Sequence, residues 1–222
     1  MKTRILLLVL VALMPSGNVF AANKVFTDSG EILDGEVWDM VDIFGDDTIV
    51  DMTGGIVDYI STFDSSTLNM FGGQAEVGAF GTSLINIYGG DLFWGGASAW
   101  DEATVNLFDC EYYSRELSAH DSGIANMLGG TVEYLRAGGF GVLNLFGGSV
   151  IDSLGAWESS LVNVYGYDLD KTTIGGLYGY GQVSGFWSDD APFTIDFYNA
   201  ETYLHVNLVP EPSTLILSLI HI

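Results

Sequence analysis

A polar residue between two apolar neighbours recurs along this chain every 17 to 20 residues, and this repeat limits the fold more than any other feature. The recurring residues are Asp51, Asn69, Asn86, Asn106, Asn126, Asn144 and Asn163. A regular period of this length is typical of a solenoid, in which one structural unit stacks on the next. The chain is therefore expected to fold by stacking similar coils.

Around each recurring residue, which we call the anchor, the pattern has a period of two. The residues just before and just after the anchor are apolar in every unit. Side chains two positions apart lie on one face of a strand, so these two columns are predicted to line the core. We expect the anchor side chains to hydrogen-bond from one unit to the next. An aromatic residue often stands two positions after the anchor, and a glycine pair then supplies the positive φ angles of a tight corner.

The upstream half of each unit also repeats. It contains an alanine column, then an aromatic column, then an acidic column of Asp46, Asp64, Asp101, Asp121 and Glu158. Strand-length segments broken by glycines predict an all-β fold. We expect a parallel β-solenoid (β-helix) of about seven rungs of ~19 residues over 46–171. The general bias of crossover connections makes it right-handed. Short end caps are expected at 22–45 and 172–208, where the repeat is weak.

The N-terminus has the pattern of a signal peptide. Lys2 and Arg4 precede an apolar run that is too short to span a bilayer, and small residues stand at Val19 and Ala21. Residues 1–21 are therefore predicted to be a signal peptide cleaved after Ala21, and the protein to be secreted.

The C-terminal residues Val209, Pro210, Glu211 and Pro212, followed by an apolar run, resemble the PEP-CTERM sorting signal. Rungs similar to "VNIYGG" in secreted bacterial proteins extend the resemblance over most of residues 46–212. The resemblance implies an exosortase-type sorting enzyme as partner and delivery to the cell surface or extracellular matrix. It implies membrane contact only through the sorting segment, and it brings no catalytic residues. Residues 209–222 are expected to be a truncated form of this signal, because no arginine cluster follows.

The chain is strongly acidic, with 29 Asp and Glu against 6 Lys and Arg and a net charge of -23. Nucleic-acid binding depends on basic patches, so no nucleic-acid partner is expected. A single cysteine, Cys110, excludes an internal disulfide.

Two columns contain candidate binding residues. Phe63, Phe80, Trp100 and Trp157 share the upstream aromatic column. If it faces outward, it forms a track suited to sugar rings of an extracellular polysaccharide, and the alternative is that it packs inside at a corner. Asp101 and Asp121 are neighbours in the acidic column and are candidate Ca²⁺ ligands, because calcium takes oxygen ligands. The alternative is a solvated column of turn residues. No other cofactor is expected.

Three functions are compatible with these patterns. The favoured one is a secreted, non-enzymatic structural or adhesion protein of the surface or extracellular matrix. A carbohydrate-binding module with an aromatic track is the alternative. A polysaccharide lyase would need a base beside carboxylates. The mature chain offers Lys24, Arg115, Arg136 and Lys171, of which Arg115 and Arg136 lie one rung apart.

Overall fold

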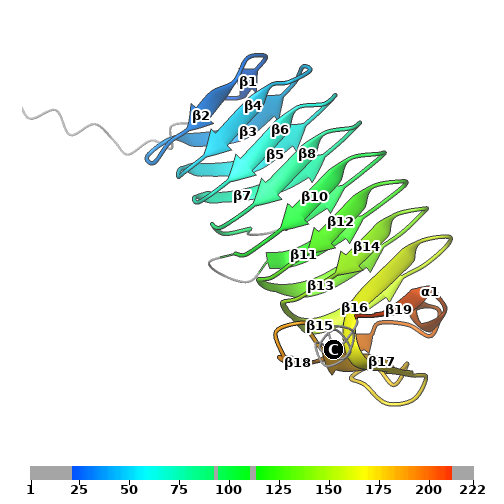
Figure 1. Cartoon of the computed structure of the whole chain (residues 1–222). Coiled ribbons are helices and arrows are strands. Elements are labelled where there is room, and N and C mark those ends of the chain that lie inside the picture. Colours follow the sequence, from blue (N-terminus) through cyan, green and yellow to red (C-terminus); the bar gives the residue numbers. More distant parts are fainter. Residues whose placement is uncertain (1–21, 93–94, 111–113, 212–222) are drawn as a thin grey trace, which may run out of the picture.

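The computed structural model describes residues 22–92, 95–110 and 114–211. Its strands stack as parallel coils along one axis, from β1 near the N-terminus to β19 near the C-terminus (Figure 1). Each coil gives one strand to each of two sheets, which we call sheet A and sheet B. The fold is thus the β-solenoid that the repeat predicted, and the repeat itself forms about seven turns of ~19 residues. Among the described residues, no helix has the length and apolar character that crossing a bilayer requires.

The two sheets alternate along the chain, and successive strands within each sheet pair in parallel. Sheet A contains β1 (Lys24–Phe26), β3 (Val37–Ile43), β5 (Ile56–Thr62), β7 (Gln74–Ala79), β9 (Ala97–Ala99), β11 (Ser114–Ala119), β13 (Thr131–Ala137) and β15 (Ser149–Ala156). Sheet B contains β2 (Gly30–Ile32), β4 (Ile49–Met52), β6 (Thr67–Met70), β8 (Leu84–Ile87), β10 (Thr104–Leu107), β12 (Ile124–Met127), β14 (Val142–Leu145) and β16 (Leu161–Thr172). Asn106 is level with Asn86 on one side and Asn126 on the other. The register read from the repeat is therefore confirmed.

The core lies between the two sheets. In β10, Val105 and Leu107 are buried while Thr104 and Asn106 point outward and are half-buried. The short sheet B strands from β6 to β14 show this same alternation. The upstream alanines are also fully buried, for example Ala99 and Ala119.

The two glycines of each corner pair are required for different reasons. In the pair Gly89–Gly90, the second glycine has φ +95°, a conformation that other residues rarely adopt. The first glycine is needed for closeness, since a Cβ there would lie 2.9 Å from the carbonyl oxygen of Phe71 in the preceding coil. Both positions exclude a side chain, so the pair recurs as a unit.

Both ends of the stack contain more coil than the repeat indicated. At the N-terminus, β1 pairs in parallel with β3 and β2 with β4, so stacking begins at Lys24, inside the expected cap. At the C-terminus, β16 turns back as antiparallel β17 (Gln182–Phe186), which pairs with antiparallel β18 (Pro192–Phe197). After α1 (Thr202–His205), β19 (Val206–Pro210) pairs in parallel with β16, while β18 pairs in parallel with β15. Together β18 and β19 form one further coil.

Lys171 holds this last coil to the stack. Its Nζ donates to the carbonyl oxygens of Tyr203 at 3.1 Å and Val206 at 2.7 Å, around the end of α1. Burial lowers the pKa of the Lys171 ammonium. One of the few basic side chains is thus used to close the fold.

Candidate functional site

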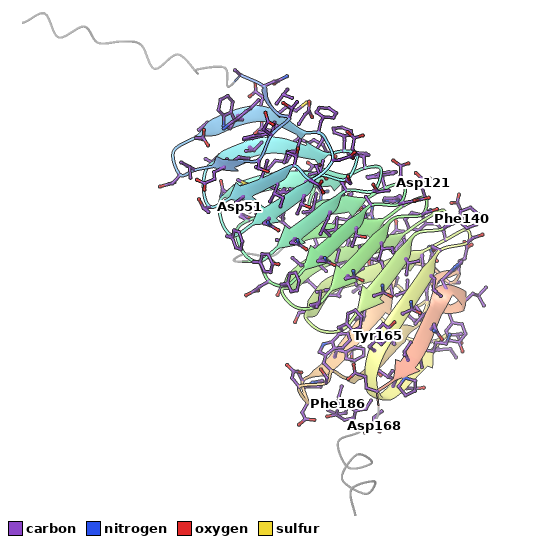
Figure 2. The ribbon with its side chains drawn as sticks, turned by 45° about the horizontal axis from the view of Figure 1, so that its top comes forward. Asp51, Asp121, Phe140, Tyr165, Asp168 and Phe186 are labelled. Carbon is purple, nitrogen blue, oxygen red and sulfur yellow. The ribbon has the colours of Figure 1, made fainter. Side chains whose placement is uncertain are left out.

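The anchor residues form a continuous hydrogen-bonded ladder along the outside of sheet B. Asn69 Nδ2 donates to Asp51 Oδ1 at 2.9 Å, and the same bond recurs at 3.0, 2.9, 2.7, 2.8 and 2.9 Å up to Asn163. Asn207 of β19 then donates to Asn163 at 3.1 Å. The expected ladder is confirmed, and it extends one coil beyond the repeat recognised in the sequence. Figure 2 places Asp51 and Tyr165 toward opposite ends of the stack.

Beside this ladder runs a row of aromatic side chains, which are exposed at Phe71, Tyr88 and Phe108 and half-buried at Phe146 and Tyr165. The rings of Phe71 and Tyr88 stack at 5.1 Å between centroids with 9° between planes, and those of Tyr88 and Phe108 at 4.6 Å and 10°. Phe146 and Tyr165 stack at 4.3 Å. Each inner ring therefore has its faces covered by neighbours and shows solvent an edge.

The upstream aromatic column, which contains the predicted sugar track, is half-buried along a corner of sheet A. Phe63 and Phe80 stack at 5.3 Å, Phe80 and Trp100 at 6.4 Å, and Trp100 and His120 at 4.2 Å. Stacking along the axis covers the faces of Phe63, Phe80 and Trp100. Sugar rings bind aromatic faces rather than edges, so the interior of this column is poorly placed to bind them.

Trp157 differs from the other rings of the column. The coil between His120 and Trp157 has Gly138 in the aromatic position. The Trp157 ring lies 6.3 Å from His120, tilted by 50°, and a Cβ on Gly138 would fall 2.7 Å from Trp157 Nε1. The indole therefore occupies the space that the missing aromatic side chain leaves.

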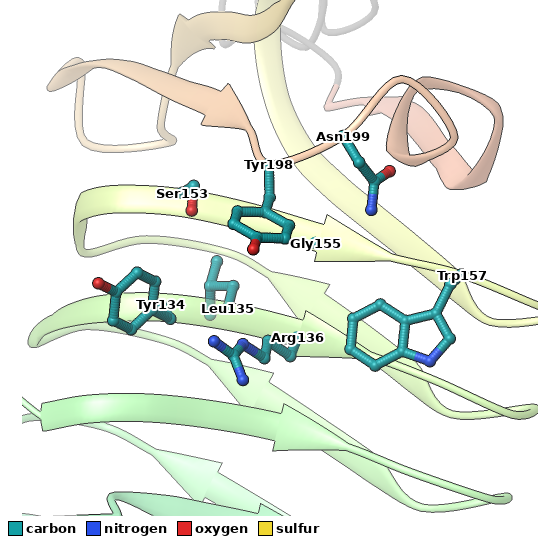
Figure 3. Close-up of a pocket in the computed structure, with 8 residues that line it drawn as sticks. All are labelled: Tyr134, Leu135, Arg136, Ser153, Gly155, Trp157, Tyr198 and Asn199. Carbon is teal, nitrogen blue, oxygen red and sulfur yellow. The ribbon is translucent and has the colours of Figure 1, made fainter. Parts of the chain in front are cut away.

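Trp157 lines a pocket on the outer face of sheet A (Figure 3). The other lining residues come from β13, from β15 and from the segment after β18: Tyr134, Leu135, Arg136, Ser153, Gly155, Tyr198 and Asn199. The cavity holds about 180 Å³, roughly six water volumes. It is smaller than a typical drug-sized site, so it suits one small ring or group.

Polar groups surround the aromatic rings of this pocket. The Arg136 guanidinium lies 5.3 Å from the centre of the Tyr134 ring and forms an ion pair with Glu116 at 3.2 Å. A hydrogen bond to Glu133 raises the pKa of the Tyr134 hydroxyl. Rings with nearby N–H and O–H groups are the usual composition of a sugar-binding site. Of this set, the sequence analysis singled out Trp157 and Arg136 but did not bring them together, and Tyr198 and Asn199 come from a segment outside the repeat.

The acidic column is set by backbone conformation. Asp64, Asp101, Asp121 and Glu158 have positive φ between 55° and 65°, and glycines replace them in the coils of Gly81 and Gly139, also at positive φ. Aspartate and glycine are among the residues that tolerate this region. Level with Asp64 stands Gly45, whose N–H donates to Asp64 Oδ2 at 3.2 Å. Asp46 therefore lies one position outside the column, because its coil contains an extra residue at this corner.

The predicted calcium ligands lie in neighbouring coils of this column. Asp101 Oδ2 accepts a hydrogen bond from the Gly81 N–H at 3.1 Å, so part of its carboxylate is already engaged. No group of three or more His, Cys, Asp or Glu side chains placed to hold a metal is found within the described ranges. Calcium binding at Asp101 and Asp121 stays a hypothesis beside the alternative of a solvated column of turn residues.

The two arginines considered for a lyase are not level with each other, and one histidine outside the repeat, His205, is held by the last coil. By register, Arg115 is level with Glu133 rather than with Arg136, which is opposite Ser118. His205 Nδ1 lies 2.9 Å from the Ser160 carbonyl oxygen, and its Nε2 lies 3.6 Å from Glu201. Neither imidazole nitrogen therefore faces a hydroxyl that it could activate.

The segment predicted to be a sorting motif begins inside the folded stack. Val209 and Pro210 belong to β19, level with Tyr165 and Gly166, and the Glu211 N–H donates to the Gly166 carbonyl at 2.8 Å. Pro212 and the predicted signal peptide, residues 1–21, lie outside the described residues. The boundary placed at residue 209 therefore shifts to the end of β19.

Comparison of this chain with known family models, curated proteins and solved structures finds no match.

Proposed function

We propose that this chain is a secreted, non-enzymatic structural or adhesion protein of a bacterial surface or extracellular matrix, sorted through Val209, Pro210, Glu211 and Pro212. The observation that carries the proposal is the position of the motif at the end of β19. A sorting enzyme acting there would meet a finished solenoid with no linker between the last coil and the motif. The ladder, the stacked rings and the buried alanine column are all features that hold the stack together.

The test is expression of the full chain in a bacterium that has an exosortase-type enzyme, followed by cell fractionation. We expect the N-terminus of the exported protein at Ala22 and protease-accessible protein on intact cells. Alanine substitution of Glu211 and Pro212 should abolish surface display and leave the melting temperature unchanged, because both follow the last strand. Retained Met1 would contradict export, and unchanged display of the variant would contradict sorting by this motif.

Carbohydrate binding is the second candidate, and the pocket at Trp157 is the observation that favours it. The open floor is provided by Gly155, where an added Cβ would lie 3.4 Å from the Trp157 ring and 3.7 Å from the Tyr198 Cβ. Both are ordinary contact distances, so a Cβ fits here, and the two further methyl groups of Gly155→Val should block the pocket. The Arg136 guanidinium and the Asn199 amide supply hydrogen-bond donors for sugar hydroxyls or carboxylates.

Affinity electrophoresis against neutral and acidic bacterial polysaccharides tests this second function. We expect Trp157→Ala and Gly155→Val to remove retardation, and Trp100→Ala to preserve it because both faces of that ring are covered. An equal loss of retardation in Trp100→Ala would instead indicate that the whole upstream aromatic column binds the sugar chain. Absence of retardation with every polysaccharide would remove carbohydrate binding and leave the structural function.

A further inference from the structure

The outer side of sheet B carries three uncharged rows across β6, β8, β10, β12, β14 and β16. We call this surface the ladder face. Its first row is Thr67, Leu84, Thr104, Ile124, Val142 and Leu161, its middle row is the Asn ladder, and its third row is Phe71, Tyr88, Phe108, Leu128, Phe146 and Tyr165. None of these described positions holds an acid or a base, although the chain has a net charge of -23. The ladder face is a neutral strip on a strongly acidic molecule.

Large apolar side chains are exposed along this strip. Phe71 is 51% exposed, Tyr88 43% and Leu128 42%. Contiguous exposed apolar surface of this kind marks an interaction site rather than ordinary solvent-facing surface. The strip continues onto β19 through Asn207 and Val209, where the first-row position, level with Leu161, is held by His205 beside Glu201.

The chemistry of the ladder face favours a protein partner over a sugar chain. Tyr88 has a stacked ring on each of its faces, and Phe71, Phe108, Phe146 and Tyr165 each have a ring on one face, so mainly ring edges are available. Each inner Asn amide already donates to one neighbour and accepts from the other, as Asn106 does with Asn86 and Asn126. The ladder thus uses one N–H and one oxygen lone pair of each inner Asn, which leaves a sugar chain only the remaining half of each amide.

We propose that the ladder face binds the ladder face of a second copy of this chain. The rows of two copies have the same spacing, about 4.8 Å between strands, so the ridges of one fit the grooves of the other along the whole length. Contact through any acidic face would instead bring like charges together. The same patch on both partners gives a closed two-fold dimer. This self-association goes beyond surface delivery and does not depend on it.

The size of the face is sufficient for such a dimer. Seven strands including β19 span about 34 Å, and five residues across a strand span about 16 Å. The flat area is then roughly 550 Å² on each copy, or about 1,100 Å² in total, just above the roughly 1,000 Å² expected of a biological interface. A weak but specific dimer follows from this area.

Sedimentation velocity of the purified protein, whether or not it has been exported, from about 1 µM to about 200 µM, tests the proposal over the range in which a weak dimer forms. We expect a monomer–dimer equilibrium that strengthens with added NaCl, because salt screens the repulsion between two acidic chains. Tyr88→Asp should weaken dimerisation at least about a hundredfold, since it buries a charge in an apolar contact. Phe71→Asp is a second variant at the most exposed ring of the row, where folding is least at risk.

Phe140→Asp is the matched control. Phe140 is 69% exposed and lies near Asp121 along a different edge of the stack (Figure 2). It should dimerise like the wild type, and melting curves should show all variants folded. A monomer at every concentration, or equal weakening by Phe140→Asp and the two face variants, would overturn the proposal. Tyr88-dependent binding of a polysaccharide by a strictly monomeric protein would also overturn it. Surface localisation is measured separately, so failure of either idea leaves the other standing.

Discussion

Asn69 Nδ2 donates to Asp51 Oδ1 at 2.9 Å, and this bond ends the Asn ladder at a side chain that has no N–H of its own to donate. Each Asn in the ladder donates toward the N-terminal end of the stack and accepts from the C-terminal side. The residue at the N-terminal end has only to accept, and an ionised carboxylate does only that. The single aspartate among the anchors is therefore placed where its chemistry fits.

The ladder predicts a position-dependent cost of removing an amide. Asn106→Ala leaves the Asn86 carbonyl and the Asn126 amide without partners, so we expect a loss of about 1–3 kcal/mol in the free energy of unfolding. Asn207→Ala removes one terminal bond and should cost about 0.5–1.5 kcal/mol. Urea denaturation of both variants measures this difference. Equal costs would show that the amides act independently.

The two-sheet core predicts a contrast between two leucines. Leu145 is fully buried, whereas Leu128 is 42% exposed on the ladder face. Leu145→Ala should cost about 2–5 kcal/mol, since it leaves a cavity in the core. Leu128→Ala should stay within about 1 kcal/mol. Chemical denaturation at a concentration where the protein is monomeric provides the comparison, and a larger cost at Leu128 would mean that the register is wrong.

The positive-φ column predicts which substitutions Asp101 tolerates. Asp101→Gly relieves the backbone at φ 57° but loses the bond to the Gly81 N–H, so its stability should stay within about 1 kcal/mol of wild type. Asp101→Val loses the bond and fits the conformation badly, so it should cost about 2–3 kcal/mol. Glu102→Val, at the next exposed position, is the control and should have little effect. Thermal and urea unfolding would settle the order, and a tolerated valine would contradict the backbone explanation.

Calcium gives a separate test of the pair Asp101 and Asp121. Because the column follows from backbone conformation, we expect millimolar CaCl₂ and NaCl of equal ionic strength to shift the melting temperature equally. A specific site would add RT ln(1 + [L]/Kd), about 2.7 kcal/mol at a hundredfold excess of calcium over Kd. A larger shift in calcium that disappears in the Asp101→Asn, Asp121→Asn double variant would establish the site instead.

Glu76 predicts a pH dependence of stability. Burial, together with the negative charge of Glu116, raises the pKa of the Glu76 carboxyl above 4.5. The folded protein then holds this proton more tightly than the unfolded chain, so the contribution of Glu76 to stability falls as pH rises through 4.5 and past the raised pKa. Glu76→Gln should therefore be more stable than wild type at pH 7, and the gain should vanish below about pH 4. Glu102→Gln controls for the loss of one negative charge, and an equal gain there would refute the assignment.

Much of the fold can be read from the sequence because each coil repeats the same local rules. The buried neighbours of the anchor, the stacking of Phe71 on Tyr88 and the Asn ladder follow from period-two patterning applied at a fixed interval. Such columns can be seen in one chain without knowing its contacts. The sequence predicted the positive φ of the glycine pair but not the close approach of the preceding coil, which excludes a side chain at Gly89.

The two features that the sequence did not predict, the last coil and the pocket, lie where the repeat is interrupted. The last coil was hidden because the hairpin of β17 and β18 separates Asn163 from Asn207, although the two amides bond at 3.1 Å. The pocket was hidden because Tyr198 and Asn199 reach it from that same excursion. Its position beside Trp157 depends on a missing side chain at Gly138, which a search for shared residues passes over.

The direction of the Asn ladder also limits how copies of this chain can meet end to end. Among the described residues, the ladder ends on its C-terminal side at Asn207, whose side-chain oxygen Oδ1 accepts no ladder bond. At the N-terminal end, Glu31 and Asp51 are level with each other and their side chains carry only acceptors. A second copy stacked on the last coil would set carboxylates against that carbonyl, oxygen facing oxygen. Such a junction is repulsive. The same ladder that stabilises the stacking of coils within one molecule therefore disfavours head-to-tail stacking of molecules into a fibre.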